Sequence, residues 1–407
     1  MKHSIPIKDA AKIVTELANR PVVLFGAGVL AAASIYALRE HGIIPVCICD
    51  NDINKYGTQI CDISVTSPES LTNNFQNLPV VITANPMYLD EIRNQLTTLG
   101  CSNIYDIAPF LSSCSYDGSS FPIGISHFNF CLDKYFHIYF KTFYPELCVI
   151  PSLDIVITEK CSLRCKDCAN LIQYYHKPHH FTYDQVFPAL DRIMDAVDFV
   201  LEFRVLGGET FMHPKAYIFI DALRKYTNYG KICVYSNGTI VPTGENLRSL
   251  QHDDTFVRIS DYGQTSTNID TIASTFDRHN ICYDIEKCEQ WQDCASIRKT
   301  DRSRQELEAV NAECCARTVL TLLNGAICVC PFSAHATNLH AIPVSSRDRL
   351  VVGDSALDKI RAFLKDTQNS NYFEACMYCA GRPVNPPNPV PAAVQISSPL
   401  PYQTVED

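Results

Sequence analysis

The sequence lacks a surplus of basic residues and lacks a clear membrane span. Its 407 residues include 34 Lys and Arg against 44 Asp and Glu, a formal net charge of −10. Because binding to a phosphate backbone needs a basic surface, we expect no nucleic-acid partner. The apolar stretch 22–38 approaches the length of a membrane span, but its glycine turn and the Arg39-Glu40 that follow fit a strand, a turn and a helix better. We therefore expect no membrane partner either.

A secretory signal is also missing. Residues 1–20 carry charges at regular intervals and have no apolar core, which is not the pattern of an export signal. The chain nevertheless contains 20 cysteines. In a reducing compartment thiols bind metals more often than they form disulfides, so we expect a cytoplasmic protein with metal-bound cysteines.

Three cysteines lie close together in one short segment. Cys161, Cys165 and Cys168 are separated by three and by two residues, so a single loop can place them at three corners of an iron–sulfur cubane. Such a cluster usually has four thiolate ligands, and three thiolates leave one iron open for something else to bind. A zinc loop or three buried core thiols would give the same spacing.

A glycine pair follows the next apolar segment. Residues 203–206 read as a short strand that runs directly into Gly207, Gly208 and Glu209. Glycines at a strand end let the backbone approach a ligand closely, and a carboxylate just beyond them is well placed to receive an ammonium group. An ordinary turn would explain the same residues.

A polar turn ends a further apolar segment. Residues 231–235 read as a strand, and Ser236 and Asn237 follow it. The side chains of both residues could hydrogen-bond a ribose. This signal is weak when it stands alone, and it gains weight from its order after the cysteine loop and the glycine pair.

Together these motifs resemble the radical S-adenosylmethionine (AdoMet) enzymes, which combine a Cys-x3-Cys-x2-Cys loop, a Gly-Gly-Glu and a ribose-contacting polar turn. The resemblance implies that Cys161, Cys165 and Cys168 hold a [4Fe–4S] cluster whose open iron is chelated by AdoMet, with Glu209 near the amino group. It also implies an electron donor such as a flavodoxin or ferredoxin, and a 5′-deoxyadenosyl radical that abstracts hydrogen from a small-molecule substrate. One departure is Asp167, where the family often has an aromatic residue beside the adenine.

The apolar segments around the motifs predict parallel strands. Short, partly β-branched runs alternate with stretches long enough for helices, at 153–158, 203–206, 232–235, 256–259 and 281–283. The resemblance implies a partial parallel (β/α)6 barrel, with the active site at the carboxyl ends of the strands. Arg258 and Ser260 fall there and are further candidates for AdoMet binding. A barrel ion pair for Arg258 and a surface turn for Ser260 explain them equally well.

A second cysteine group follows the barrel. Adjacent cysteines at 314–315 precede a glycine-turned hairpin, and a Cys-x2-Cys pair comes later. Four thiolates in two pairs suit a closed site for an Fe–S cluster or for zinc. The spacing resembles the one-cluster "twitch" form of the SPASM-like auxiliary domains found behind many radical AdoMet barrels. The resemblance implies a second [4Fe–4S] cluster on Cys315, Cys330, Cys376 and Cys379, with Cys314 and Cys328 as alternatives.

The first part of the chain predicts a separate nucleotide-binding type of domain. A strand at 21–25 leads into Gly26, Gly28 and Ala31 with G-x-G-x-x-A spacing, and a second strand ends at Asp50. This is the dinucleotide-binding fingerprint with an acidic residue about twenty positions downstream, so Gly26, Gly28 and Asp50 are candidate nucleotide contacts. The domain resembles Rossmann-like domains attached to enzymes of surface-polysaccharide pathways, where ligand binding and purely structural use both occur.

We therefore predict an α/β protein with five parts. They are a doubly wound Rossmann-like domain at 1–110, a linker at 111–148, the partial parallel barrel at 149–290, a small cysteine-rich cluster domain at 291–382 and a proline-rich tail at 383–407. The tail is expected to be extended, either disordered or draped over the barrel.

The predicted function is a radical AdoMet enzyme, of oxidoreductase or isomerase type, that oxidises or epimerises a small sugar-like or nucleotide-sugar substrate. The Rossmann-like domain is the only reason for that substrate. A maturase that modifies a ribosomally made peptide is the rival enzyme, and it would be expected to carry a peptide-recognition domain instead. Without enzyme activity, the chain would be a zinc-stapled nucleotide-binding or scaffold protein. The sequence identifies no catalytic residue.

Overall fold

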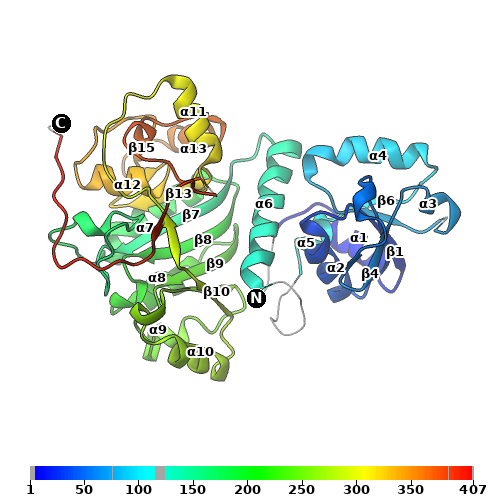
Figure 1. Cartoon of the computed structure of the whole chain (residues 1–407), viewed down its shortest axis with the longest axis horizontal. Coiled ribbons are helices and arrows are strands. Elements are labelled where there is room, and N and C mark those ends of the chain that lie inside the picture. The colour runs from blue at the N-terminus through cyan, green and yellow to red at the C-terminus, as the bar shows by residue number, and fades with distance from the viewer. Residues whose placement is uncertain (1–4, 76, 115–123, 384, 406–407) are drawn as a thin grey trace. The chain divides into compact units, whose positions relative to one another are not determined.

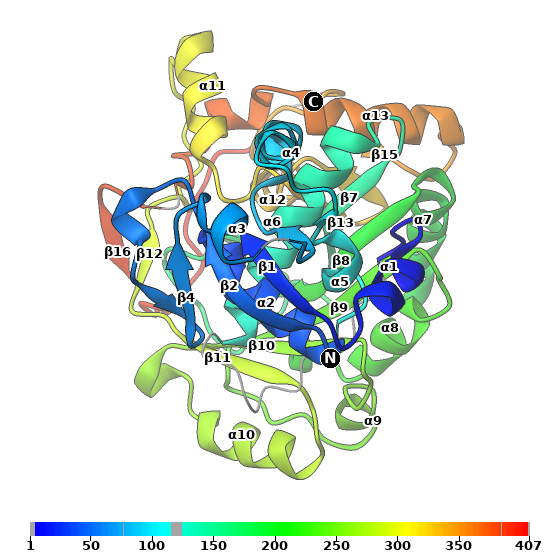
Figure 2. The same ribbon diagram turned by 90° about the vertical axis from the view of Figure 1, so that its right-hand side faces the viewer.

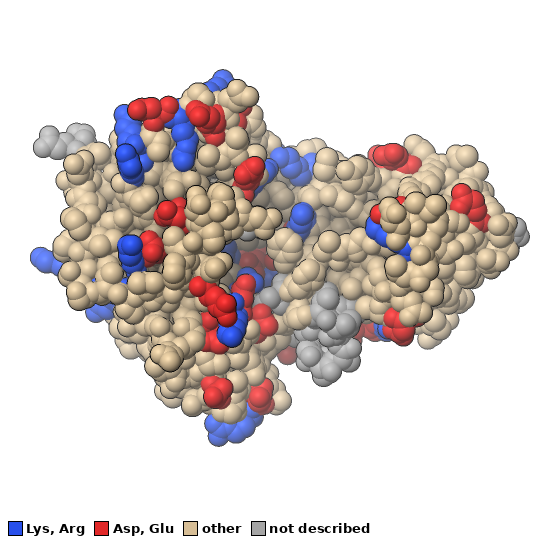
Figure 3. All heavy atoms as spheres, in the orientation of Figure 1, with Lys and Arg blue, Asp and Glu red and all other residues tan. Residues whose placement is uncertain are grey.

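The computed structural model describes residues 5–75, 77–114, 124–383 and 385–405. The chain divides into two compact units, Met1–Leu147 and Cys148–Asp407 (Figure 1). None of the described helices combines the length and the apolar character of a membrane span. On the face drawn in Figure 3, acidic and basic side chains are scattered among each other and do not gather into a basic patch.

A six-stranded sheet forms the centre of the first unit. Its strands are β1 (Pro21–Phe25), β2 (Ile44–Cys49), β3 (Gln59–Ile60), β4 (Ile63–Thr66), β5 (Val80–Ile82) and β6 (Ile104–Asp106). They lie in the order β3-β4-β2-β1-β5-β6, and all are parallel except β3, which pairs antiparallel with β4. Counted along the chain, the parallel strands follow the order third, second, first, fourth, fifth. This is a doubly wound Rossmann-like sheet, which confirms the fold predicted for this part.

Helices flank this sheet in the first unit. They are α1 (Ala10–Leu17), α2 (Leu30–Glu40), α3 (Ser70–Asn73), α4 (Leu89–Thr98), α5 (Ala108–Leu111) and α6 (Ile125–Phe143), with short 3-10 turns η1 (Ile53–Lys55) and η2 (Pro86–Tyr88). Helix α6 lies within the segment 111–148 that was predicted as a linker. It contains a run of aromatic residues at helical spacing, which buries Phe128 against Tyr36 of α2 with ring centroids 5.6 Å apart.

The loop between β1 and α2 contains two motif glycines, and the backbone conformation requires glycine only at the first. Gly26 has a φ of +120°, and a Cβ there would lie 3.2 Å from the backbone of Thr83. A side chain at Gly28 would meet nothing within 4 Å. The first glycine is therefore fixed by the fold, whereas the second leaves free space in front of the loop.

The carboxylate of Asp50, which directly follows β2, hydrogen-bonds the backbone of this loop. Its carboxylate accepts hydrogen bonds from the backbone N–H of Ala27 at 2.6 Å and of Asp52 at 2.8 Å, and Lys55 Nζ lies 3.1 Å away. Burial raises the pKa of Asp50, but the two N–H donors and Lys55 outweigh that effect and lower it overall. Both carboxylate oxygens are thus engaged by the chain itself, and the ribose contact predicted for Asp50 stays a prediction.

An eight-stranded sheet organises the second unit. Its strands are β7 (Val149–Thr158), β8 (Phe199–Gly207), β9 (Tyr229–Ser236), β10 (Thr255–Asp261), β11 (Tyr283–Lys287), β13 (Val319–Leu323), β14 (Ala326–Cys328) and β15 (Arg349–Val351). The order is β11-β10-β9-β8-β7-β13-β14-β15. Strands β7 to β11 are parallel neighbours in chain order, as expected. Four predicted runs fall within β7 to β10, whereas the fifth, at 281–283, overlaps β11 only at Tyr283.

The sixth parallel strand, β13, does not lie next to β11, where a (β/α)6 barrel built in chain order would place it. Strand β13 pairs parallel with β7 at the opposite end of the series from β11, and β14 and β15 follow it antiparallel. The cysteine-rich segment therefore extends the same sheet (Figure 1). Because strand pairing is decided by tertiary contacts, the sequence pattern alone could not assign β13 to this edge.

Helices and a two-stranded ribbon complete the second unit. The helices are α7 (Tyr183–Ala196), α8 (Ala216–Leu223), α9 (Gly244–Arg248), α10 (Ile269–Arg278), α11 (Arg304–Glu313), α12 (Pro331–Asn338) and α13 (Leu357–Asn369), with 3-10 turns η3 (Ile172–Tyr174), η4 (Thr210–Met212), η5 (Gly263–Thr265) and η6 (Glu374–Met377). The ribbon pairs β12 (Gln290–Gln292) with β16 (Pro389–Pro391) of the tail, and the two strands lie beside each other in Figure 2. Of the two states expected for the tail, its described residues 385–405 take the draped one.

The glycine loop of the first unit gives a stability test. Gly26→Ala forces a Cβ onto a positive φ and against Thr83, so it should lower the free energy of unfolding by about 1–3 kcal/mol. Gly28→Ala is the matched control and should change it by less than about 0.5 kcal/mol. Urea denaturation of the full chain measures both. Equal effects of the two substitutions would contradict the assigned roles.

Candidate functional site

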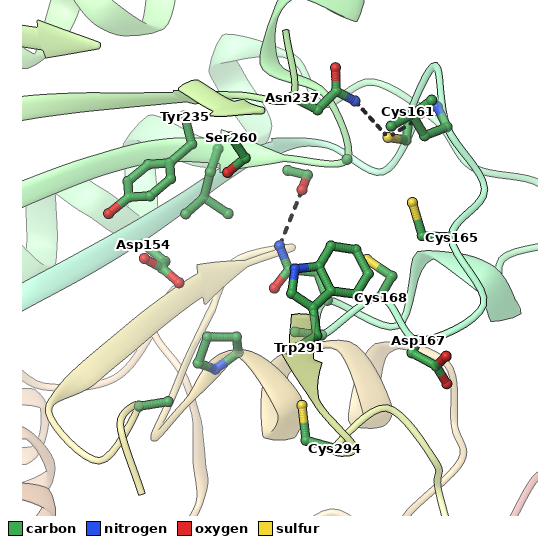
Figure 4. Close-up of a pocket in the computed structure, with 18 of the residues that line it drawn as sticks. Asp154, Cys161, Cys165, Asp167, Cys168, Tyr235, Asn237, Ser260, Trp291 and Cys294 are labelled. Atoms are coloured by element: carbon green, nitrogen blue, oxygen red, sulfur yellow. Dashed lines mark hydrogen bonds between the residues drawn. The ribbon is translucent and has the colours of Figure 1, made fainter. Parts of the chain in front are cut away.

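A cavity of about 380 Å³ lies at the carboxyl ends of the parallel strands of the second unit (Figure 4). Its walls bring together residues from motifs that lie far apart in the sequence. The predicted site residues that line it are Cys161, Cys165, Cys168, Gly207, Gly208, Ser236, Asn237, Ser260 and Cys315. The carboxyl ends of neighbouring parallel strands meet at one edge, which explains why these motifs converge.

Gly207 and Gly208 hold the start of the cysteine loop. A Cβ at Gly207 would overlap the carbonyl oxygen of Thr158, and one at Gly208 would overlap that of Lys160. The N–H of Gly208 donates to Thr158 O at 3.0 Å, and that of Glu209 donates to Lys160 O at 2.9 Å. The glycines are therefore required by a backbone-to-backbone contact, in addition to any approach of a ligand.

Glu209 is buried beneath the polar turn. Its carboxylate accepts hydrogen bonds from Asn237 N at 2.6 Å, Ser236 Oγ at 3.0 Å and Phe211 N at 3.1 Å. Burial raises the pKa of Glu209 to about 7, although the three donors act in the opposite direction. The carboxylate fixes the turn and is not part of the cavity wall, so its predicted contact with an ammonium group stays a prediction.

Asn237 links the polar turn to the cysteine loop. Its Nδ2 donates to Ser162 Oγ at 3.1 Å and to Cys161 Sγ at 3.5 Å, and its Oδ1 accepts from Thr239 N at 3.1 Å (Figure 4). The side chain therefore supports a cysteine sulfur. A ribose contact by Ser236 or Asn237 remains a prediction, since Ser236 Oγ already donates to Glu209.

The thiols of the cysteine loop suit a metal cluster. Figure 4 shows Cys161, Cys165 and Cys168 around one region of the cavity. Burial raises the pKa of all three thiols, that of Cys165 to about 12, while hydrogen-bond donors to the sulfurs act against this shift. Buried sulfurs with nearby donors suit bound thiolates. Among the described residues, no group of three or more His, Cys, Asp or Glu side chains is arranged so that it could hold a metal ion.

Charged residues inside the barrel form the floor of the cavity. Arg204 Nε lies 3.1 Å from Asp154 Oδ1, and its guanidinium lies 4.7 Å from the centre of the Tyr235 ring. Burial raises the pKa of Asp154 to about 6, and Arg204 partly offsets this. The sequence analysis missed these three residues, although a charged residue inside each of two apolar strand segments is a signal that could have revealed Asp154 and Arg204.

Arg258 does not line the cavity. Its guanidinium lies 3.1 Å from Glu286 Oε2 on the neighbouring strand β11, which is the barrel ion pair weighed as the alternative. Ser260, two residues further along β10, does line the cavity. Of the two residues that the sequence analysis proposed together for AdoMet binding, only Ser260 therefore lies at the cavity.

An aromatic wall closes another side of the cavity. The rings of Tyr262 and Trp291 pack edge to face with centroids 5.3 Å apart, and Trp291 is the only tryptophan of the chain. Gln292 and Arg382 line the cavity beside them. The sequence analysis missed these residues because β12 and the tail reach the site through tertiary pairing that has no local signature.

Most thiols of the second cysteine group are buried or partly buried. Burial raises the pKa of Cys330 well above its usual value, and the neighbouring thiols of Cys376, Cys379 and Cys314 raise it further. Cys328 lies within β14, and its thiol hydrogen-bonds Thr337. Cys315 is exposed and lines the main cavity. Whether Cys314 or Cys315 joins Cys330, Cys376 and Cys379 as a ligand stays a prediction.

No protein-family model matches the chain, and no curated protein matches it. Solved structures do match. Native anSMEcpe with bound AdoMet and a Cp18Cys peptide shares 19% identity and a TM-score of 0.29, over 35% of this chain and 44% of that one. BtrN in complex with AdoMet and 2-DOIA shares 11% identity and a TM-score of 0.37, over 57% and 93%. SuiB of Streptococcus suis bound to S-adenosylmethionine shares 15% identity and a TM-score of 0.29, over 55% and 48%.

These matches are distant. The matched region spans less than half of the anSMEcpe and SuiB chains, and each of these identities lies below 20%. The TM-scores of all three matches lie below 0.4.

The raised pKa of Glu209 predicts a pH dependence of stability. The folded carboxyl holds its proton up to about pH 7, whereas the unfolded one loses it near the ordinary glutamate pKa of 4.5. The resulting stabilisation is fully present below the unfolded pKa and is lost as the pH rises through the folded one. Between pH 5 and pH 8 the wild type should therefore lose more free energy of unfolding than Glu209→Gln does.

Urea denaturation of metal-free, reduced protein at the two pH values measures this difference. Glu245→Gln removes a half-exposed carboxyl and serves as the control, which should follow the wild type. A pH profile of Glu209→Gln that runs parallel to the wild type would contradict the assigned environment of Glu209.

Proposed function

We propose that the second unit is a radical AdoMet enzyme in which Cys161, Cys165 and Cys168 hold a [4Fe–4S] cluster. The observation that carries the proposal is the meeting of three loop thiols, the glycine pair and the polar turn on one cavity. Three thiolates leave one iron for AdoMet. When bound, the cluster and AdoMet supply a 5′-deoxyadenosyl radical for hydrogen abstraction, with electrons from a donor such as a flavodoxin or ferredoxin.

The chain's own residues orient the cofactors and keep the site dry. Gly207 and Gly208 fix where the cysteine loop leaves β7, and Asn237 donates to Cys161 Sγ. Leu206 and Val319 add apolar wall to the cavity. Excluding water protects a reactive intermediate from side reactions, which is the contribution this chemistry needs from the protein.

The substrate we propose is a small hydroxylated ring such as a sugar. Trp291 and Tyr262 offer aromatic faces on which such a ring can stack. Asp154, Gln292 and Arg382 place hydrogen-bonding groups in the same cavity. Within the first unit, the open space at Gly28 before helix α2 supports a separate nucleotide site, where a phosphate would meet a helix N-terminus.

The second cysteine group favours oxidation as the net reaction. We assign Cys314, Cys330, Cys376 and Cys379 to an auxiliary [4Fe–4S] cluster. Thiolates at all four corners suit electron transfer rather than substrate binding. The guanidinium of Arg382 is half-buried, lies near the thiols of Cys294, Cys315, Cys379 and Cys314, and also lines the main cavity, so the group lies next to the place where substrate would bind.

Iron analysis tests the proposed function. Protein purified and reconstituted without oxygen should bind about eight irons, and replacement of Cys161, Cys165 and Cys168 by alanine should leave about four. The paramagnetic resonance signal of the reduced wild type should shift on addition of AdoMet, and that of the triple variant should not. Zinc without iron would overturn the enzyme and support the zinc-stapled alternative.

A pair of adjacent cysteines tests the auxiliary site. Cys314→Ala should lose about four irons while the AdoMet-responsive signal persists, because only one of two clusters is affected. Cys315→Ala is the matched control and should keep the full iron content. Loss of iron in Cys315→Ala but not in Cys314→Ala would restore the set preferred from the sequence.

A further inference from the structure

The proline-rich tail lies directly across the cysteine loop. After β16 pairs with β12, the chain continues so that Val394 O accepts from Lys166 N at 2.7 Å and Ile396 N donates to Arg164 O at 2.9 Å. These two contacts flank Cys165 on both sides. We call residues 389–396 the strap.

The side chain of Gln395 completes this contact. Its Oε1 accepts from Arg164 N at 2.8 Å, and its Nε2 donates to Ala393 O at 2.7 Å and to Cys165 Sγ at 3.1 Å. A backbone N–H can only donate, so the amide oxygen must face Arg164. The same orientation turns the NH₂ group toward the sulfur, and all three contacts agree on it.

The strap is fixed at both ends. On one side, β16 pairs with β12, the strand that carries Trp291 and Gln292 into the cavity wall. On the other side, Leu400 N donates to Gln173 O at 2.8 Å and the Tyr402 ring packs on Tyr174 with centroids 5.7 Å apart. A segment tied at both ends holds the side chain of Gln395 against Cys165 with little freedom to move away.

We propose that Gln395 is a positioning residue of the cluster site, and that the strap belongs to the machinery that holds and tunes the [4Fe–4S] cluster. This inference rests on the proposed function. A hydrogen bond to a cluster thiolate stabilises the added negative charge of the reduced state, and so raises the reduction potential. The strap also covers Cys165, which is buried, and slows the loss of iron to solvent.

The test compares Gln395→Ala with the wild type and with Gln403→Ala, which removes an exposed glutamine of the same terminal segment. The full chain is reconstituted without oxygen, and the AdoMet-responsive resonance signal is followed during a redox titration. We expect the equilibrium constant for reduction of Gln395→Ala to fall about tenfold, or about 59 mV for one electron. Iron from this cluster should be lost to a chelator about tenfold faster. Gln403→Ala should match the wild type.

A Gln395→Ala variant with the wild-type potential and wild-type iron loss would overturn the inference while leaving the enzyme in place. A second readout does not need the cluster at all. In metal-free protein, Gln395→Ala should speed amide hydrogen exchange at Arg164, which loses its acceptor on the strap. Unchanged exchange at Arg164 would also overturn the proposed contact. Failure of the wild type to bind iron would instead overturn the proposed function, so the two failures are distinguishable.

Discussion

The site depends on one backbone contact, the pairing of the end of β8 with the start of the cysteine loop. Gly208 N reaches Thr158 O only because neither glycine carries a Cβ. The same turn directs Glu209 beneath the polar turn, which in turn holds Asn237 against Cys161. One close approach thus connects β7, β8 and β9 to the thiols, and any side chain at the glycine pair would break all of these links together.

The cavity lies between two groups of thiols with different surroundings. The loop cysteines sit under hydrogen-bond donors from the polar turn and the strap, and they leave room for a further ligand. The thiols of the second group surround Cys330, and Arg382, which lines the cavity, lies near them. Under the proposed function, an open cluster site and a closed one would let the protein start a radical reaction and also remove an electron from it.

The sequence predicted what depends on local pattern. The glycine fingerprint predicted the Rossmann-like sheet, and four apolar runs predicted β7 to β10, while the run at 281–283 overlaps β11 at one residue only. The sequence did not predict features that depend on contacts between distant residues. These are the position of β13 beside β7 and the contact of Gln395 with Cys165 across 230 positions. The choice between neighbouring cysteines also cannot be made from the sequence, because adjacent side chains point apart and only tertiary contacts decide which of them meets the other thiols.

The most direct test of the central claim is the formation of 5′-deoxyadenosine from AdoMet, followed by mass spectrometry after anaerobic reduction of the reconstituted protein. We predict that the wild type produces 5′-deoxyadenosine and that a variant lacking Cys168 does not, because the loop then offers two thiolates in place of three. Wild-type protein that carries its full iron and leaves AdoMet intact under reduction would contradict the account.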